Sequence, residues 1–186
     1  MPRTAPQRPA LRIGSFNLRG LAAAGRLHAA AALWRAARYD IVLIQEHHLI
    51  SLLHDHALIQ ALASLGWHAF FSFSRPGPGG GRRGGTAVLL RHALMRSGEL
   101  AEPTVQHCPR GRFTALSLTW SGHSLHICSV YLPNVAHKRA AYISSCLAPL
   151  AAAARARRRQ LVWGGDFNFT PDPHLDRRSI ARTPLR

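Results

Sequence analysis

The segment Leu11–Ile44 constrains the fold most, because it contains the patterns of a strand, a helix and a second strand in immediate succession. Leu11–Phe16 has the composition of a short strand, and the alanine-rich stretch Leu21–Arg38 places its larger apolar residues at helical spacing. Ile41–Ile44 is a continuous apolar run, which is typical of a strand buried on both faces. This order predicts a right-handed crossover between parallel strands in an α/β protein.

The remainder of the chain continues with further strands and helices. Ser51 is a plausible N-cap for a helix that ends near Leu65, and a long helix is expected between Ala136 and Arg159. Ser121-Gly122-His123 separates two alternating runs, which indicates a β-hairpin. The remaining expected strands are Trp67–Phe73, Thr86–Arg91, Arg112–Trp120, Ser124–Tyr131 and Leu161–Gly165, and His92–Pro109 favours turns with a short edge strand.

Length and composition favour one globular domain, since the chain has 186 residues of which 47% are hydrophobic. We place this domain at residues 11–179, between a disordered segment at 1–10 and a tail at 180–186. No apolar run is long enough for a membrane span, and Met1–Ala10 does not have the pattern of a secretory signal. Three widely spaced cysteines indicate a reducing compartment and no disulfide-linked partner. We therefore expect an intracellular protein, nuclear or cytoplasmic, with no membrane contact.

The charge balance favours a polyanionic partner, most simply nucleic acid. The formal net charge is +16, from 24 basic and 8 acidic residues, and Lys138 is the only lysine. A GC-rich gene would also enrich arginine, together with alanine, glycine and proline, so the charge has a purely compositional alternative. Four histidines cluster locally without metal-site spacing, and we expect them to be solvated or helix-capping: His47, His48, His54 and His56.

The candidate site lies at the ends of the predicted strands. Asp166 and Asn168 follow a strand that stops at two glycines, and their spacing of two points both side chains the same way. A carboxylate beside a carboxamide suits a hard metal, a polarised water or a phosphate oxygen, and an Asx turn is the alternative. Ligand sites of α/β sheets lie beyond such strand ends. Further polar residues follow other strands: Asn17, Glu46, Tyr131 and Asn134.

The glycine-rich segment Arg75–Gly85 is expected to form a loop rather than a P-loop, because it lacks the Gly-Lys-Ser/Thr ending. Arg82 and Arg83 in this loop could contact a nucleic-acid backbone. A solvated hairpin tip is the competing interpretation.

Five segments in order and at characteristic spacing resemble the endonuclease/exonuclease/phosphatase superfamily. They are Ser15–Gly20, Asp40–Glu46, Gly85–Leu90, Val130–Asn134 and Gly164–Asn168. Within the superfamily the chain looks most similar to the apurinic endonuclease-like domains of LINE-type retrotransposons, and Leu175-Asp176-Arg177 supports this subgroup. The resemblance implies an α/β fold with two packed β-sheets flanked by helices, a four-layer DNase I-like sandwich. Because the last strands of the family are not matched, one sheet is expected to keep an open edge.

The resemblance also implies roles for the metal and the water. Glu46 would be a ligand of Mg²⁺, with Mn²⁺ as the alternative, and Asn17 would hold the metal or its water. Asp166 would orient and activate the attacking water.

Three further residues would act on the substrate by the same resemblance. Asn168 would hydrogen-bond a phosphate oxygen as charge develops there, and Asn134 would help to position the same phosphate. Tyr131 would donate to the phosphate or steady the leaving group.

The function implied is a Mg²⁺-dependent phosphodiesterase that hydrolyses the DNA backbone. One alternative is a phosphatase of phosphoinositides or other phosphoesters, and another is a catalytically dead mobile-element remnant that binds nucleic acid by charge. Members of the family complete the site with a later aspartate and a terminal Asp-His pair, which have no assigned counterparts before Arg186. His174 and Asp176 lie too near the Gly-Asp-Phe-Asn motif to be taken as replacements. Activity of the isolated chain is therefore left open, as are its oligomeric state and its place in a larger retrotransposon protein.

Overall fold

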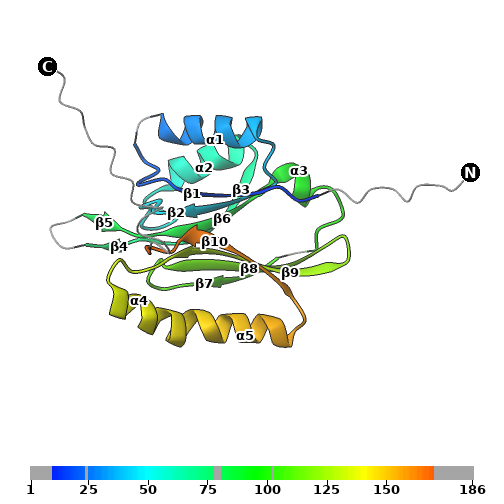
Figure 1. Cartoon of the computed structure of the whole chain (residues 1–186). Helices are drawn as coiled ribbons and strands as arrows, with labels where there is room; N and C mark the ends of the chain where they lie inside the picture. The colour runs from blue at the N-terminus through cyan, green and yellow to red at the C-terminus, as the bar shows by residue number, and fades with distance from the viewer. Residues whose placement is uncertain (1–9, 24, 78–80, 102, 170–186) are drawn as a thin grey trace, which may run out of the picture.

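A computed structural model of the chain describes residues 10–23, 25–77, 81–101 and 103–169. The described part is a sandwich of two four-stranded sheets with helices on both outer faces (Figure 1). This confirms the predicted four-layer α/β class. The expected tail at 180–186, the segment 1–10 apart from Ala10, and the residues His174 and Asp176 lie outside the described residues.

The first sheet has the strand order β1-β2-β6-β3 and is covered on its outer face by two helices (Figure 1). β1 and β2 are parallel, and the other two pairings are antiparallel. Because a helix connects the two parallel strands, the crossover expected from the sequence is present. The elements are β1 (Ile13–Asn17), α1 (Arg26–Ala36), β2 (Ile41–Gln45), α2 (His56–Ser64), β3 (Trp67–Ser72) and β6 (Thr86–Arg91).

The second sheet has the order β10-β9-β8-β7, with β10 parallel to β9 and the other pairs antiparallel. The predicted hairpin is the pair β8–β9, and a smaller hairpin, β4–β5, projects from one end of the molecule (Figure 1). The elements are β4 (Arg75–Pro76), β5 (Arg82–Arg83), α3 (His92–Met95), β7 (Thr104–His107), β8 (Phe113–Trp120), β9 (His123–Tyr131), α4 (Ala136–Tyr142), a π-helical segment (Ile143–Leu147), α5 (Ala148–Ala156) and β10 (Gln160–Asp166).

Strand β2 shows why its sequence is apolar without interruption. Ile41 and Leu43 belong to the buried cluster between the two sheets, whereas Val42 and Ile44 belong to the cluster beneath α1 and α2. All four side chains are almost completely buried. Both faces of this strand are therefore covered, as the continuous apolar run predicted.

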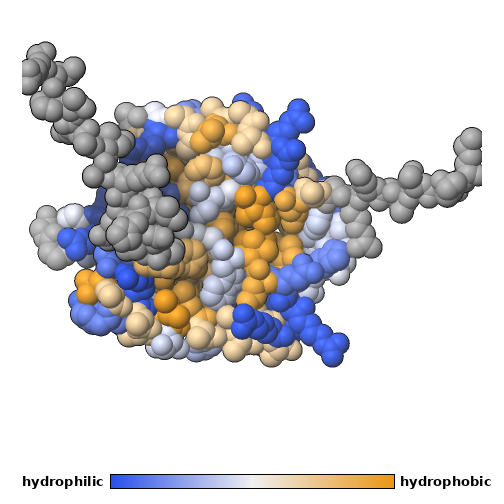
Figure 2. All heavy atoms as spheres, viewed as in Figure 1, coloured by the Kyte–Doolittle hydropathy of each residue, from blue (hydrophilic) through white to orange (hydrophobic). Residues whose placement is uncertain are grey.

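Strands β1 and β10 are less covered than β2. Both are edge strands, and each is paired on one side only in the described part. On the face that carries these strands, Figure 2 shows a band of apolar residues between hydrophilic ones. Ile13 of β1 and Val162 of β10 are only partly buried members of the inter-sheet cluster. An open edge was expected from the sequence, and the described residues leave both sheets open here.

Helix α1 begins at Arg26, not at Leu21 as predicted, and the difference has a structural cause. The residue before it, Gly25, has a positive φ of 71°. The preceding loop is instead held by the Arg26 side chain, whose Nη1 donates to the carbonyl oxygens of residues 18, 19 and 20. Leu21 is buried within this loop. Helical spacing of apolar residues therefore extended the prediction into a loop that an arginine organises.

The predicted cap of the second helix is also wrong. Helix α2 begins at His56 and its N-cap residue is Asp55, whereas Ser51 begins the turn before the helix, where its Oγ accepts the His54 N–H at 3.1 Å. In that turn the Asp55 Oδ2 atom accepts hydrogen bonds from the backbone N–H groups of Ile50 and Ser51, at 2.6 and 3.3 Å. Asp55 thus fixes the entry of the chain into the helix.

The long helix expected from Ala136 to Arg159 is divided by the π-helical segment and ends at Ala156. Pro149 lies at the start of α5. Proline lacks the N–H that would bond to the carbonyl of Ser145, and its ring conflicts with that carbonyl. The widened π-turn directly before the proline accommodates this missing bond.

His47 is a core residue and not a solvated histidine as expected. Its Nδ1 accepts from the Leu49 N–H at 2.9 Å, and its Nε2 lies 3.2 Å from the carbonyl of Thr86. Its ring also contacts the ring of Phe71 edge-on. Burial lowers the pKa of His47 to about 4, so the ring is a neutral structural group at pH 7.

No described helix is long and apolar enough to cross a membrane. All three cysteines are free.

The two glycines of β10 are needed for close packing. A Cβ on Gly165, whose φ is 155°, would overlap the carbonyl of Val130 on the paired strand. A Cβ on Gly164 would lie 2.9 Å from the Leu43 Cδ1 atom, the mobile end of a side chain. Only the first obstacle is rigid backbone.

We therefore predict that Gly165→Ala lowers the free energy of unfolding by about 3 kcal/mol, the upper end for overpacking, and Gly164→Ala by about 1 kcal/mol. Urea unfolding followed by circular dichroism measures both values. Equal losses in the two variants would contradict the backbone overlap as the cause.

Candidate active site

The ends of three strands from two sheets meet at one amide group. Asn17 is the last residue of β1, Glu46 follows β2, and Asp166 is the last residue of β10. The Asn17 Nδ2 atom donates to Glu46 Oε1 and to Asp166 Oδ2, both at 2.8 Å. All three side chains are half-buried. The structure thus brings together three of the six residues that the strand-end pattern selected, and we call these three the carboxylate cluster.

The loop after β10 fixes the orientation of Asp166. Its Oδ1 atom accepts from the backbone N–H of Asn168 at 3.0 Å, which is the Asx turn considered as an alternative to a site. The turn and the site coexist, because Oδ2 of the same carboxylate faces Asn17. Asn168 has a positive φ of 51°, and its Nδ2 donates to the Leu132 carbonyl at 2.6 Å. One of its two amide N–H groups is therefore already occupied by the protein.

Glu46 is held in an unfavourable backbone conformation. Its φ is 54°, in the left-handed region, which costs a non-glycine residue about 1–3 kcal/mol. The Gly20 N–H donates to its carbonyl at 2.6 Å, and the His48 Nε2 lies 3.6 Å from its Oε2. Such strain persists only where the surroundings impose it, and it concentrates at functional positions.

Tyr131, at the end of β9, borders the same hollow as Glu46 and interacts electrostatically with its carboxylate. Burial raises the pKa of Tyr131 to about 12, and the neighbouring Glu46 carboxylate adds to the shift. The Arg112 guanidinium lies over the ring, 4.8 Å from its centroid, and opposes it. The hydroxyl is therefore protonated at neutral pH and acts as a hydrogen-bond donor.

Hollows lie on both sides of the carboxylate cluster, and they differ in charge. One, of about 530 Å³, is bounded by Glu46 and Tyr131 and is rich in cationic side chains. The other, of about 750 Å³, has no basic residue among its described lining residues. The first is lined by Glu46, His48, Arg82, Arg83, Gly84, Arg112, Tyr131, Pro133, Asn134, Val135 and Lys138; the second by Ser15, Asn17, Gln45, Gly165, Asp166, Phe167, Asn168 and Phe169.

Four of the five residues expected to contact a phosphate line the cationic hollow, namely Tyr131, Asn134, Arg82 and Arg83, whereas Asn168 lines the other hollow. Arg82 is 3.6 Å from the Asp55 carboxylate and 2.7 Å from the His54 ring nitrogen, so its charge is partly neutralised. Arg83 and Asn134 are exposed. The two arginines form β5 of the β4–β5 hairpin, so a hairpin is present and its base borders the hollow. Residues 78–80 at its tip lie outside the described residues.

Two further arginines organise the site, and the sequence analysis did not select them. The Arg139 Nη1 donates to the carbonyls of Pro133, Asn134 and Asn168 at 3.2, 3.0 and 2.6 Å, which ties two loops together. The Arg112 Nη1 donates to the carbonyls of residues 131 and 132 at 3.4 and 3.2 Å. Their acceptors are backbone atoms, so no side-chain pattern in the sequence could have identified them.

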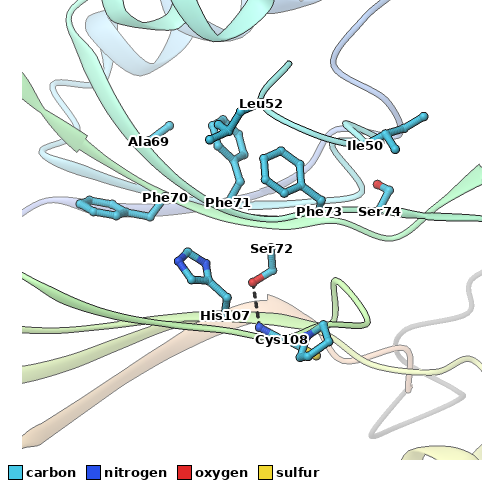
Figure 3. A pocket seen from close by; sticks show the side chains of 11 residues that line it. Ile50, Leu52, Ala69, Phe70, Phe71, Ser72, Phe73, Ser74, His107 and Cys108 are labelled. Atoms are coloured by element: carbon cyan, nitrogen blue, oxygen red, sulfur yellow. Dashed lines mark hydrogen bonds between the residues drawn. The ribbon is translucent and has the colours of Figure 1, made fainter. Parts of the chain in front are cut away.

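A separate apolar hollow of about 570 Å³ lies between β3 and the end of β7, at the sheet edge opposite to β1 and β10 (Figure 3). Phe70, Phe71 and Phe73 contribute to its walls. Its Ser72 hydroxyl is already used, because it donates to the Phe113 carbonyl and accepts from the Cys108 N–H. Its described lining has no carboxylate. Phe71 and Phe73 belong to the cluster beneath the helices and Phe70 to the cluster between the sheets, so this hollow lies around the edge of the first sheet (Figure 3).

Comparison with known protein families identifies the family of this chain. The model of the Endonuclease/Exonuclease/phosphatase family matches residues 14–185, and the chain belongs to this family. This confirms the resemblance carried by the five sequence segments. A comparison with curated proteins gave no match.

Solved structures similar to this one include nucleases and a phosphatase. An AP endonuclease from Archaeoglobus fulgidus is 22% identical, with a TM-score of 0.57 over 88% of this chain and 60% of its own. The 3′ phosphatase NExo from Neisseria, bound to a product DNA hairpin, is 24% identical, with a TM-score of 0.58 over 89% of this chain and 63% of its own. The endonuclease domain of TRAS1, a telomere-specific non-LTR retrotransposon, is 18% identical, with a TM-score of 0.53 over 88% of this chain and 63% of its own.

These identities establish a shared fold. The chain spans about 60% of the length of these structures. The activities named for the longer proteins are therefore treated below as proposals for this chain.

Substitution of Asn17 tests whether its amide group stabilises the carboxylate cluster. In Asn17→Asp the two donors are replaced by a third carboxylate, whereas Asn17→Ala removes them without adding charge. In EDTA we predict that the Asp variant is less stable than the Ala variant by about 1–3 kcal/mol, because like charges at this distance repel. Chemical denaturation at pH 8 measures the difference.

Lowering the pH in the same experiment supplies the control. A carboxyl group beside two others has a raised pKa, so protonation should restore the stability of Asn17→Asp as the pH falls toward 4. A gap between the two variants that does not change with pH would contradict the electrostatic explanation.

Proposed function

We propose that the chain is a Mg²⁺-dependent phosphodiesterase domain that hydrolyses the DNA backbone. The observation that carries this proposal is the carboxylate cluster, in which one amide of Asn17 holds Glu46 and Asp166 together beside a cationic hollow. Membership of the family supports phosphoester chemistry in general. The specific reaction, the metal and the substrate are proposals.

The donor set of the cluster fits a magnesium ion. Mg²⁺ prefers oxygen ligands, retains several waters and commonly uses one or two carboxylates. Glu46 and Asp166 supply carboxylate oxygens, and both are half-buried, so water can reach them. The Asn17 Oδ1 accepts the Arg19 N–H at 3.1 Å and has a second lone pair. When bound, the metal would polarise the phosphate and offset its developing charge.

The residues of the chain supply the remaining functions. Asp166, oriented by Asn17 and by the Asn168 N–H, is placed to accept a proton from a water that attacks phosphorus. Tyr131 stays protonated and can donate to a phosphate oxygen or to the departing oxygen. A P–O bond to water forms while the ester P–O bond breaks, and the leaving oxygen takes up a proton.

Asn134 and Asn168 complete the substrate contacts in this proposal. Asn134 borders the hollow next to Tyr131, and Asn168 retains one amide N–H beyond its bond to Leu132. Both loops are fixed by Arg139, which lowers the reorganisation required when a phosphate binds.

DNA is the proposed substrate because of charge and of two structural neighbours. The net charge of +16 favours a polyanion. The neighbour NExo was solved with a DNA hairpin, and the neighbour from the retrotransposon TRAS1 is its endonuclease domain. NExo is a 3′ phosphatase, so removal of a terminal phosphate is the second candidate function at the same site. We further propose an intracellular location, which the free buried thiols of Cys108 and Cys128 support.

Plasmid nicking tests the proposal. The purified chain should relax supercoiled plasmid in Mg²⁺ and not in EDTA, and Glu46→Gln or Asp166→Asn should lower the rate by at least about 100-fold. Both substitutions keep the side-chain size, so the loss reports on charge.

Folding and metal binding are measured on the same samples. Mg²⁺ should raise the melting temperature of the unmodified chain and raise that of Glu46→Gln less. A hairpin with a 3′ phosphate distinguishes the second candidate function. If no substrate is hydrolysed while salt-dependent DNA binding remains, the third interpretation, a non-catalytic nucleic-acid-binding domain, replaces the proposal.

A further inference from the structure

We propose that the cationic hollow continues into a groove that binds the sugar–phosphate backbone on one side of the cleaved phosphate. This inference rests on the proposed function. The groove combines the hollow beside Tyr131 with a second hollow of about 360 Å³ along α4. The two share Arg112, Pro133 and Lys138. We call the combined feature the flanking groove.

The shared residues make the groove continuous. Lys138 lies on α4 and Pro133 on the loop after β9, so the path passes from the end of the second sheet onto the helix that covers it. α4 and the β4–β5 hairpin lie at the same end of the molecule (Figure 1). Both contribute to the lining of the groove, the hairpin through Arg82 and Arg83 and the helix through Lys138. The second hollow extends the lining to Arg110, Ala141, Tyr142, Ser145 and Cys146.

The cationic side chains of the groove differ in whether they already interact with other groups of the protein. Arg82 is near Asp55, and Arg112 is committed to two carbonyls and to the Tyr131 ring. Arg83, Arg110 and Lys138 are exposed, and none of them forms an ion pair among the described residues. These three side chains, spread along the groove, provide charge available to a ligand.

The distribution of charge around the carboxylate cluster is one-sided. Glu46 is the only acidic residue in the described lining of the flanking groove. The hollow on the other side of the cluster has Asp166 and no basic residue in its described lining. A polyanion is therefore attracted along one direction from the cleaved phosphate and not along the other.

Separated cations indicate a chain of phosphates as the ligand. A single phosphate at Tyr131 would leave Arg110 and the α4 end of the groove without a partner. Successive phosphates of one DNA strand supply repeated negative charges, and lysine and arginine bind them without regard to sequence. The groove would thus contribute to affinity for long substrates and not to hydrolysis of a small ester.

A charge-removal experiment tests the groove. In Arg110→Gln/Lys138→Gln, anisotropy measurements in EDTA should show about tenfold weaker binding of a duplex of about 16 base pairs. The slope of log affinity against log salt should fall by about 2, one for each lost phosphate contact. Hydrolysis of bis(4-nitrophenyl) phosphate in Mg²⁺ is measured on the single variant Arg110→Gln and should be unchanged, because Arg110 lines the hollow along α4 and not the hollow beside Glu46 and Tyr131.

Arg155→Gln/Arg158→Gln is the matched control. Both arginines are exposed at the end of α5, away from the groove, and their removal changes the net charge equally (Figure 1). This variant should lose less than about twofold in affinity. Equal weakening in both variants would overturn the groove, because net charge alone would then explain binding. Reduced diester hydrolysis in Arg110→Gln would also overturn it, since Arg110 would then act at the cluster.

The design separates this inference from the proposed function. If the unmodified chain does not hydrolyse the diester but only the groove variant loses DNA affinity and salt slope, the proposed activity fails and the groove stands. If hydrolysis is present and the groove variant binds as tightly as the unmodified chain, the activity stands and the groove fails.

Discussion

The contact between the Asn17 amide and two carboxylates is the interaction on which the arrangement of the site depends. Asn17 and Asp166 end the edge strands of two different sheets, and Glu46 follows the strand beside Asn17. Two carboxylates that are hydrogen-bonded to the same amide nitrogen repel each other, and the repulsion is stronger where water is partly excluded. Two hydrogen bonds to charged acceptors, each worth about 1.5–3 kcal/mol, offset this repulsion. The amide therefore couples the relative position of the sheets to the geometry of the site.

A layer of polar contacts between the sheets supports this coupling. The Gln45 Nε2 donates to the Ser129 hydroxyl at 3.0 Å, and that hydroxyl donates to the Ile44 carbonyl at 2.8 Å. Thr86 and Thr114 are hydrogen-bonded across the same interface at 2.9 Å. Apolar contacts between sheets tolerate small sliding motions, whereas satisfied buried hydrogen bonds select one arrangement. The core is thus polar near the site, where orientation matters, and apolar beyond it, where burial supplies stability.

The strands and the meeting of their ends could be predicted from the sequence, because both follow from local patterns. An apolar run such as Ile41–Ile44 indicates a buried strand, and polar residues after parallel strands converge in α/β folds. The partition of β1 and β10 into different sheets could not be predicted, since it depends on pairing across the whole chain. The roles of Arg112 and Arg139 were equally hidden, because backbone carbonyls carry no sequence signature. His47 was misassigned because polarity outweighed its position directly after a buried strand.

The arginines of the chain have two different roles. Some hold loops by hydrogen bonds to backbone carbonyls, and others are exposed charges available to a ligand. The Arg26 and Arg139 side chains each donate to three carbonyls through one nitrogen, and each fixes a loop beside the carboxylate cluster. Arginine suits this use because its several donors have fixed directions, whereas a lysine ammonium is a mobile point charge. Such arginines contribute to net charge while serving the fold, so a charge of +16 overstates what is available to a ligand. What bears on function is where the uncommitted cations lie, and in the described lining of the hollows beside the cluster they lie on one side.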